Sequence, residues 1–362
     1  MSSTPPLAVQ ETVTAEDTLA DAAARPAPQS PKRGPRGGTV LLLMILKNKK
    51  AAVGAAILVF FAIVAIFAPQ LAPYNPDDFV SRPHQPPSSE FWLGTTGSGE
   101  DVLSQTIWGT RISLGTGVIV GIAVTIIGAL VGMTAGYFGK RVDDILSLVM
   151  NVFLIIPTLP LLVVLAGFLP AGFGTIVTVL TVTGWAWGAR VLRAQTLSLR
   201  EKDFVSSAIV SGENSFRIIF REILPNMMSI VVAGMFGAVT YAIGAQAGLE
   251  FLGLGNPSAI SWGTNLYWAQ NNSGLLQGAW WTFVPAGTCI ALVAFAFTLV
   301  NYAIDEVTNP RLRSQRETAN ALKKSHKKLG ASRATPVLRE RPAATAVAST
   351  TGGTQPSQAT GD

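Results

Sequence analysis

Long apolar runs without a charged side chain alternate with short polar segments along most of this chain. A helix needs about 20 consecutive apolar residues to cross the hydrocarbon core of a bilayer. Six stretches approach or exceed that length, and none of them contains Asp, Glu, Lys or Arg. They are Ala51–Ala68, Ile112–Gly136, Ile145–Leu169, Gly172–Ala189, Met227–Leu249 and Thr282–Ile304. The pattern predicts an all-α membrane protein with six transmembrane helices.

Charged residues are scarce and lie mostly outside these stretches. They make up 13% of the chain and apolar residues 49%, whereas soluble domains carry about 25% charged residues. The net charge of +6 would suit a protein that binds nucleic acid. The basic residues flank apolar stretches, however, which indicates that they orient the chain in a membrane. The single cysteine, Cys289, lies in an apolar run, so neither a disulfide framework nor a cysteine metal site is predicted. We expect no nucleic-acid partner and no metal site.

Lysine and arginine gather on one side of the predicted membrane. Loops on the other side contain only Arg82 and Arg111. Because the basic side of a membrane protein is normally cytoplasmic, both termini are expected in the cytoplasm. The basic residues on that side are Lys47, Lys49, Lys50, Lys140, Arg141, Arg190, Arg193, Arg200, Lys202, Arg217, Arg221, Arg311, Arg313 and Arg316.

The two ends of the chain differ in composition from its apolar centre. Residues 1–38 are rich in Pro, Ala, Ser and Thr and predict a disordered cytoplasmic tail. Residues 39–111 are expected to hold an interfacial segment, the first membrane helix and an external segment, and residues 112–310 a core of five helices. Residues 311–362 predict a basic, largely disordered cytoplasmic tail, whose lysines would be attracted to anionic lipid.

The longest charged interval inside the apolar region, residues 200–226, predicts a helical hairpin. A first helix over Lys202–Val210 is expected to stop at Ser211-Gly212, since glycine readily adopts the left-handed conformation of a helix end. Asn214 or Ser215 can cap a second helix over Phe216–Leu224, which Pro225 is expected to end. That second helix carries an apolar stripe that needs a partner; it consists of Phe216, Ile219, Phe220 and Ile223, with Arg217 and Arg221 beside it.

The hairpin resembles the coupling loop of binding-protein-dependent ABC importer permeases. That family's pattern is Glu-Ala-Ala, three residues, Gly, and further on Ile-x-Leu-Pro or a similar run. The matching positions are Ser206-Ser207-Ala208, Gly212 and Ile223-Leu224-Pro225. Serines replace the Glu and the first Ala, so a salt bridge from that Glu to an ATPase does not carry over. An ordinary packed cytoplasmic loop is the alternative interpretation of the hairpin alone.

Three further motifs resemble the second permease subunit of dipeptide, oligopeptide and nickel importers. A first motif runs over Trp92–Ser104 and continues at Gly109–Leu114. A second is Phe251-Leu252-Gly253-Leu254-Gly255, followed by Ser261-Trp262-Gly263, and a third is Asp305–Arg313. Thr96 and Glu100 stand where the family has Asp and Arg, and its usual Pro-Pro is here only Pro257. In family order, the motifs cover about residues 47–313.

The resemblance implies an ABC importer permease fold with a cytoplasmic coupling helix, in a bacterial plasma membrane. It implies three kinds of protein partner: a homologous second permease, two ATPase subunits and an extracytoplasmic substrate-binding protein. The chain has no G-x-x-x-x-G-K-[ST] motif, so ATP and Mg are expected on the ATPase subunits and no cofactor or catalytic residue on this chain. The residues expected to contact an ATPase are Ser206, Ala208, Gly212, Asn214, Ser215, Phe216, Arg217, Phe220, Leu224 and Pro225.

Five residues are candidates for the substrate path. Pro157 and Pro160 should kink or unwind the third span, either as a structural feature or as part of the path. Gln246 and Glu250 lie one helical turn apart at the end of the fifth span, where Glu250 either reaches solvent or lines the path. Trp262 belongs with Trp268, Trp280 and Trp281 either to an interfacial aromatic belt or to a loop that meets the binding protein.

The sequence thus predicts an ATP-driven importer subunit for di- or oligopeptides or a related solute. Oligosaccharides and nickel remain alternative substrates, because members of the resembling family carry them. A secondary transporter or channel is the other alternative, although such proteins commonly carry ionisable residues within their spans and the six stretches have none.

Overall fold

The computed structural model describes residues 49–308, and the side chains as far as Ile304. The predicted tails over residues 1–38 and 311–362, and the interfacial segment that precedes the first span, lie outside the described residues. The described part is helical, with one isolated β-bridge between Thr95 and Asp101.

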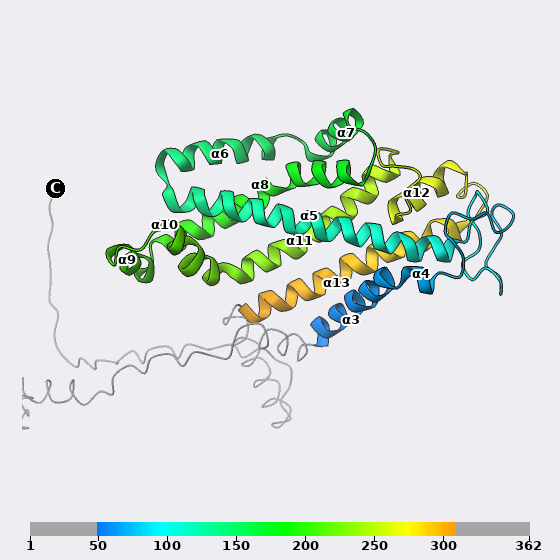
Figure 1. Ribbon diagram of the computed structural model, residues 1–362, viewed down its shortest axis with the longest axis horizontal. Helices are drawn as coiled ribbons and strands as arrows, with labels where there is room; N and C mark the ends of the chain where they lie inside the picture. Colours follow the sequence, from blue (N-terminus) through cyan, green and yellow to red (C-terminus); the bar gives the residue numbers. More distant parts are fainter. Residues whose placement is uncertain (1–48, 309–362) are drawn as a thin grey trace, which may run out of the picture. The chain divides into compact units, whose positions relative to one another are not determined.

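The described chain forms thirteen helices, five of them long (Figure 1). The long ones are α3 (Lys49–Ile66), α5 (Val102–Phe138), α8 (Phe173–Arg200), α11 (Leu224–Phe251) and α13 (Val284–Thr308). The others are α4 (Ala68–Leu71), α6 (Lys140–Ile155), α7 (Thr158–Phe168), α9 (Asp203–Val210), α10 (Ser215–Arg217), the π-helix η1 (Ile218–Ile223), α12 (Trp262–Asn271) and the 3-10 helix η2 (Trp280–Thr282).

Five helices of the described part are long and apolar enough to cross a membrane, and a bent pair brings the number to six if it counts as one span. The bent pair is α6 and α7, which meet at 87°. The break falls at Ile156-Pro157, so the predicted interruption of the third span by proline is confirmed. Proline has no N–H to continue the helical ladder, and the Pro157 carbonyl instead accepts the first bond of α7, from the Leu161 N–H at 3.1 Å.

Helices α5 and α8 touch backbone to backbone along three successive turns. A Cβ atom on Gly132 would lie 2.3 Å from the Ala189 carbonyl oxygen, and one on Gly136 would lie 2.8 Å from the Arg193 carbonyl oxygen. Elsewhere on α5, Gly117 and Gly121 leave room for the side chains of Ile243 and Val239 of α11. The glycines of α5 therefore allow close approach of α8 on one face and of α11 on another.

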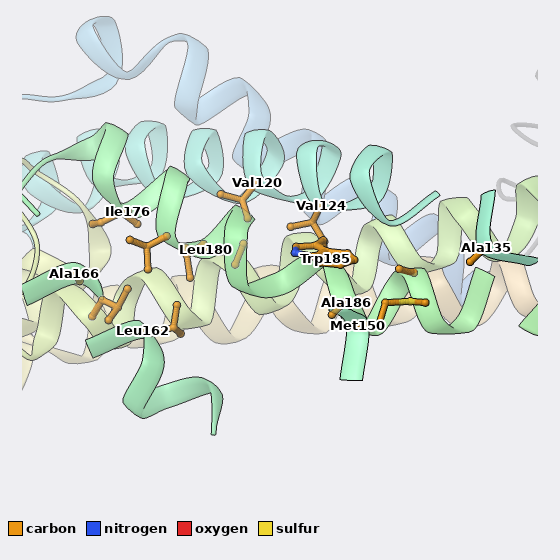
Figure 2. Packing of buried hydrophobic residues seen from close by; sticks show 14 residues of the cluster. Val120, Val124, Ala135, Met150, Leu162, Ala166, Ile176, Leu180, Trp185 and Ala186 are labelled. Atoms are coloured by element: carbon orange, nitrogen blue, oxygen red, sulfur yellow. The ribbon is translucent and has the colours of Figure 1, made fainter. Parts of the chain in front are cut away.

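Helices α6 and α7 cover one side of this pair through an apolar cluster (Figure 2). Met150 of α6 and Leu162 of α7 are buried there with Leu180 and Trp185 of α8, and the Trp185 ring meets Phe153 edge-on at 5.3 Å. At the start of α6 Asp143 accepts two hydrogen bonds from the Arg193 guanidinium of α8. This bidentate ion pair fixes α6 against α8 next to the helix end.

We expect Gly132→Leu to damage the fold, because the new side chain would overlap the α8 backbone, and overpacking costs about 1–3 kcal/mol or more. Gly115→Leu, on the same helix, is the matched control, since a Cβ there would meet no atom within 4 Å. The thermal midpoint of the purified protein in detergent should fall for Gly132→Leu and stay near that of the wild type for Gly115→Leu. Equal midpoints for the two variants would contradict the described packing.

Candidate functional site

The hairpin of α9 and α10 turns at a glycine, as predicted. Gly212 has φ +78°, a conformation that residues with a Cβ rarely adopt. Its N–H donates to the Ile209 carbonyl at 3.0 Å, and the Glu213 N–H donates to the Ala208 carbonyl at 3.1 Å. These two bonds are those of a Schellman helix end, and they satisfy carbonyls that the end of α9 would otherwise leave free.

Asn214 is the residue that caps the second half of the hairpin. Its side-chain oxygen accepts a hydrogen bond from the Phe216 N–H at 3.1 Å, while Ser215 is the first residue of α10. Glu213 and Arg217 form an ion pair at 3.6 Å across the same turn. The predicted cap is thus confirmed for Asn214.

The expected end of the second helix at Pro225 is wrong. The chain passes from α10 into the π-helix η1 and then directly into α11, so that residues 215–251 form one continuous helical run. Pro225 stands in the first turn of α11, where a missing N–H is tolerated. Because the π-helical turn changes the hydrogen-bond register just before Pro225, the proline does not interrupt the run.

The apolar stripe of the hairpin is covered mostly by the chain itself. Ile219 and Ile223 are buried in a cluster with Val205 of α9 and Met227 of α11, and Phe220, Ala208 and Leu224 pack against that cluster in part. The stripe as a whole therefore does not need an external partner, in contrast to the prediction. Phe216 is the exception in the stripe: it is 68% exposed, with its ring 4.4 Å from that of Phe220.

Exposed apolar side chains flank the Gly212 turn on both sides. Val210 is 88% exposed, and Ile209 and Phe216 are also exposed. Ser206, Arg217 and Pro225 are exposed as well. In Figure 1 the hairpin lies at one end of the helices, and α4 and α12 lie near the other. A short, rigid apolar tip of this kind can insert into a groove of another protein.

A cavity of about 660 Å³ opens between the helices. Residues of α5, α6, α7, α8, α11 and α13 contribute to its lining, and most are apolar or glycine. The polar lining residues are Thr125, Thr158, Thr183, Tyr241 and Asn301, and the part of the chain that the structure describes contributes no Asp, Glu, Lys, Arg or His to the lining. The size is that of a small-molecule site, about 300–1,000 Å³.

The structure divides the five candidate path residues into two groups. Pro157 and Pro160 are exposed at the break between α6 and α7, next to Thr158, which lines the cavity. Gln246, Glu250 and Trp262 are buried and are not among the residues that line it. Their part in a substrate path stays a prediction.

Trp262 and Glu250 have internal partners instead of solvent. The Trp262 backbone N–H donates to Ser113 Oγ at 3.1 Å, and its indole N–H donates to the Thr106 carbonyl at 3.2 Å. Trp262 is fully buried, so its assignment to an interfacial belt is wrong, while Trp268 and Trp280 are exposed. Glu250 does not reach solvent.

The Glu250 carboxylate joins the end of α11 to the start of α12. It accepts a hydrogen bond from Gln246 Nε2 at 2.9 Å on one oxygen and one from the Ser261 hydroxyl on the other. Ser261 and Thr264 in turn form the capping box of α12. Glu250 therefore holds the loop of the Phe251–Gly255 motif against the helix that begins at Trp262.

At the end of the helices where α12 lies, the segment that precedes α5 contacts the segment that precedes α13. The Trp281 indole donates to the Thr95 carbonyl at 3.2 Å, and His84 Nε2 lies 3.0 Å from the Asn272 carbonyl oxygen. Within the first segment the Thr96 hydroxyl donates to the Glu100 carboxylate. The two positions that depart from the family pattern thus contact each other.

Burial raises the pKa of the Glu100 carboxyl above its ordinary value; the hydrogen bond from Thr96 opposes this shift and the charge of Asp77 adds to it. Between the ordinary pKa and the raised one the folded chain holds more proton than the unfolded chain, so stability falls as the pH rises through this interval. The ionised carboxylate therefore costs stability at neutral pH.

We expect Glu100→Gln to raise the thermal midpoint at pH 7, because it removes the buried charge and keeps an oxygen that can accept the Thr96 hydrogen bond. The gain should shrink as the pH falls toward 4, where the wild-type carboxyl is protonated. Glu90→Gln, at an exposed position, is the control. A gain that is equal at pH 4 and pH 7 would show that burial of the Glu100 charge is not the source of the lost stability.

Sequence reasoning missed the residues that line the cavity. Tyr241, Asn301 and the glycines of α8 and α11 belong to no motif, and apolar periodicity does not separate a cavity wall from a packing face. Tyr241 and Asn301 could have been found because each is a side chain with strong hydrogen-bonding groups within an apolar span.

Comparison with known proteins gives two family matches. Residues 128–314 match the family described as "Binding-protein-dependent transport system inner membrane component". Residues 39–87 match the "N-terminal TM domain of oligopeptide transport permease C".

Curated relatives carry matching names. The dipeptide transport system permease protein of Bacillus subtilis is 35% identical over 272 residues, which cover 74% of this chain and 83% of the relative. The oligopeptide transport system permease protein of the same organism is 33% identical, over 75% of this chain and 89% of the relative. The oligopeptide transport system permease protein of Mycobacterium tuberculosis is 32% identical, over 77% of this chain and 96% of the relative. The chain therefore belongs to the family of binding-protein-dependent transport system inner membrane components.

Proposed function

We propose that this chain is a permease subunit of an ATP-driven importer for di- or oligopeptides. The observation that carries the proposal is the exposed apolar tip around Gly212, at one end of helices that enclose an uncharged cavity. The names of the relatives support peptides as the solute over oligosaccharides or nickel. Two ATPase subunits would bind and hydrolyse ATP with Mg, and this chain would carry out no catalysis.

The tip would dock on an ATPase subunit in the cytoplasm. Phe216 is exposed in the isolated chain, and Gly212 and Asn214 fix the direction of the turn that presents it. Arg217 is held beside it by Glu213. A homologous second permease would complete the pathway, and an extracytoplasmic binding protein would deliver the peptide at the α12 end.

Basic residues support this orientation. Lys140, Arg141, Arg200 and Lys202 lie at the ends of helices next to the hairpin, whereas Arg82 and Arg111 lie in or near the opposite loops. By the positive-inside rule, the hairpin and both termini face the cytoplasm.

Substitutions at the tip test the function. Burying a phenylalanine side chain is worth about 1.5–3 kcal/mol, so Phe216→Ala should weaken ATPase binding by about tenfold or more. Gly212→Val should weaken it as well, because valine resists the positive φ that the turn requires. Phe79→Ala is the matched control, since Phe79 is 76% exposed in the opposite loops. The readouts are ATPase retained on the purified permease and ATP-driven uptake.

Both hairpin variants should insert normally in the membrane, because Gly212 and Phe216 both precede the apolar stretch Met227–Leu249 and lie in the turn and in the first turn of the helical run. Wild-type ATPase retention and uptake by both, at normal expression, would mean that the tip is not the docking surface and would leave the proposal without its main support.

Reporter fusions test the orientation separately. Fusions after Arg141 and Gly212 should report the cytoplasm, and fusions near Pro86 and Asn271 should report the exterior, because the basic residues are distributed that way. A cytoplasmic signal at Asn271 would contradict the proposed topology.

A further inference from the structure

Three glycines of the cavity wall are not needed for packing between the described helices. Gly188 of α8 and Gly234 and Gly237 of α11 line the cavity, and a Cβ atom at each would meet no atom within 4 Å. Gly128, in the same wall, differs: its Cβ would lie 3.2 Å from the Ala189 nitrogen. Glycine inside a helix costs roughly 0.5–1 kcal/mol relative to alanine. At the three open positions no close helix contact offsets this cost, and the effect of the glycines is to enlarge the cavity.

A hydrogen-bond acceptor in the wall has no partner. The side-chain oxygen of Asn301, on α13, is buried and receives no hydrogen bond within the described chain, although Asn301 lines the cavity. An unsatisfied buried polar atom costs about 1–3 kcal/mol. The N–H group of a peptide in the cavity would satisfy it once the Asn301 side chain turns its oxygen toward the cavity, whereas the apolar side of a partner helix would leave it unsatisfied.

The wall also disfavours charge. None of its lining residues within residues 49–304 is ionic, and an unpaired charge in an apolar environment is costly. The wall of this subunit therefore suits the uncharged side chains and the peptide groups of a solute. Charged peptide termini would have to be met by water or by the rest of the importer.

From these observations, and resting on the proposed function, we propose that Gly188, Gly234 and Gly237 are specificity-determining residues. They set the largest uncharged peptide side chain that this subunit accepts, and Asn301 binds a peptide N–H while the side chain occupies the open volume. The Cβ atom of a leucine at one of the glycines would meet no atom of the described chain within 4 Å, and its side chain would take up part of the cavity volume.

The test uses the complete importer in proteoliposomes and two labelled probes, Gly-Gly and Leu-Leu. Gly237→Leu should lower the uptake of Leu-Leu relative to Gly-Gly by about tenfold or more, since misfits of side-chain size in a pocket are worth about 10–200-fold. Gly237→Ala should give a smaller change in the same direction. Gly287→Leu is the matched control: the position is equally open but is not among the cavity residues, so the uptake ratio should stay at that of the wild type.

Asn301→Leu tests the hydrogen bond separately. It should raise KM for both peptides to a similar degree, because both present N–H groups. The thermal midpoint should not fall, since the change removes an unsatisfied buried acceptor. A lowered midpoint would show that Asn301 has a structural role and would overturn its assignment as a peptide contact.

The other outcomes are decisive as well. An unchanged uptake ratio in Gly237→Leu would overturn the inference while leaving the peptide importer intact. Loss of the second permease on purification of Gly237→Leu, with both peptides affected equally, would show that the cavity is a subunit contact, and this too overturns the inference. Failure of the wild type to import either probe would instead overturn the proposed function, and the inference with it.

Discussion

The contact between α5 and α8 depends on the absence of side chains at three positions of α5. Gly128, Gly132 and Gly136 recur every fourth residue, so they form one line along the helix, and α8 lies against this line with its own backbone. In a bilayer the lipid is as apolar as the helices, so close van der Waals contact has to replace the hydrophobic effect between them. The apolar cluster of α6, α7 and α8 is built on this pair (Figure 2). The cavity lies beside this pair, and residues of α6, α7, α11 and α13 complete its wall.

The continuous helical run from Ser215 to Phe251 gives the proposed importer a mechanical link. Its first turn carries the exposed Phe216, its middle carries Gly234, Gly237 and Tyr241 of the cavity wall, and its last turn carries Glu250. A helix transmits displacement along its axis better than a loop does, so in the proposed importer a movement of the hairpin would move the cavity wall. The π-helical turn at Ile218–Ile223 is the place where this run departs from regular geometry, and such turns are often found at functional sites.

Sequence predicted the features that depend on local chemistry. Uncharged apolar length located the spans, and Gly212 and Asn214 located the hairpin turn because glycine and asparagine have specific roles at helix ends. The features it missed depend on how neighbouring segments fold back onto one another. Ile219 and Ile223 look like an exposed stripe until Val205 and Met227 cover them, and Glu250 looks solvent-exposed until Ser261 reaches it. The register change before Pro225 likewise has no local signal, since proline suits both the end of one helix and the start of another.

The Thr96–Glu100 pair shows how a motif can change without loss of its loop. The resembling family has Asp and Arg at these positions, two groups of opposite charge, whereas in this chain a hydroxyl donates to a carboxylate. The backbone of the turn is held independently, because the Gly99 N–H donates to the Thr96 carbonyl at 3.0 Å and the Thr96 N–H donates to the Glu100 carbonyl at 2.9 Å. Gly99 itself has φ +92° and stands against the Ser81 carbonyl. With the turn fixed by glycine and by the backbone, the side-chain pair is free to vary as long as the two groups remain complementary. Exchange of one complementary pair for another would therefore change the charge of this surface and leave the backbone hydrogen bonds of the turn in place.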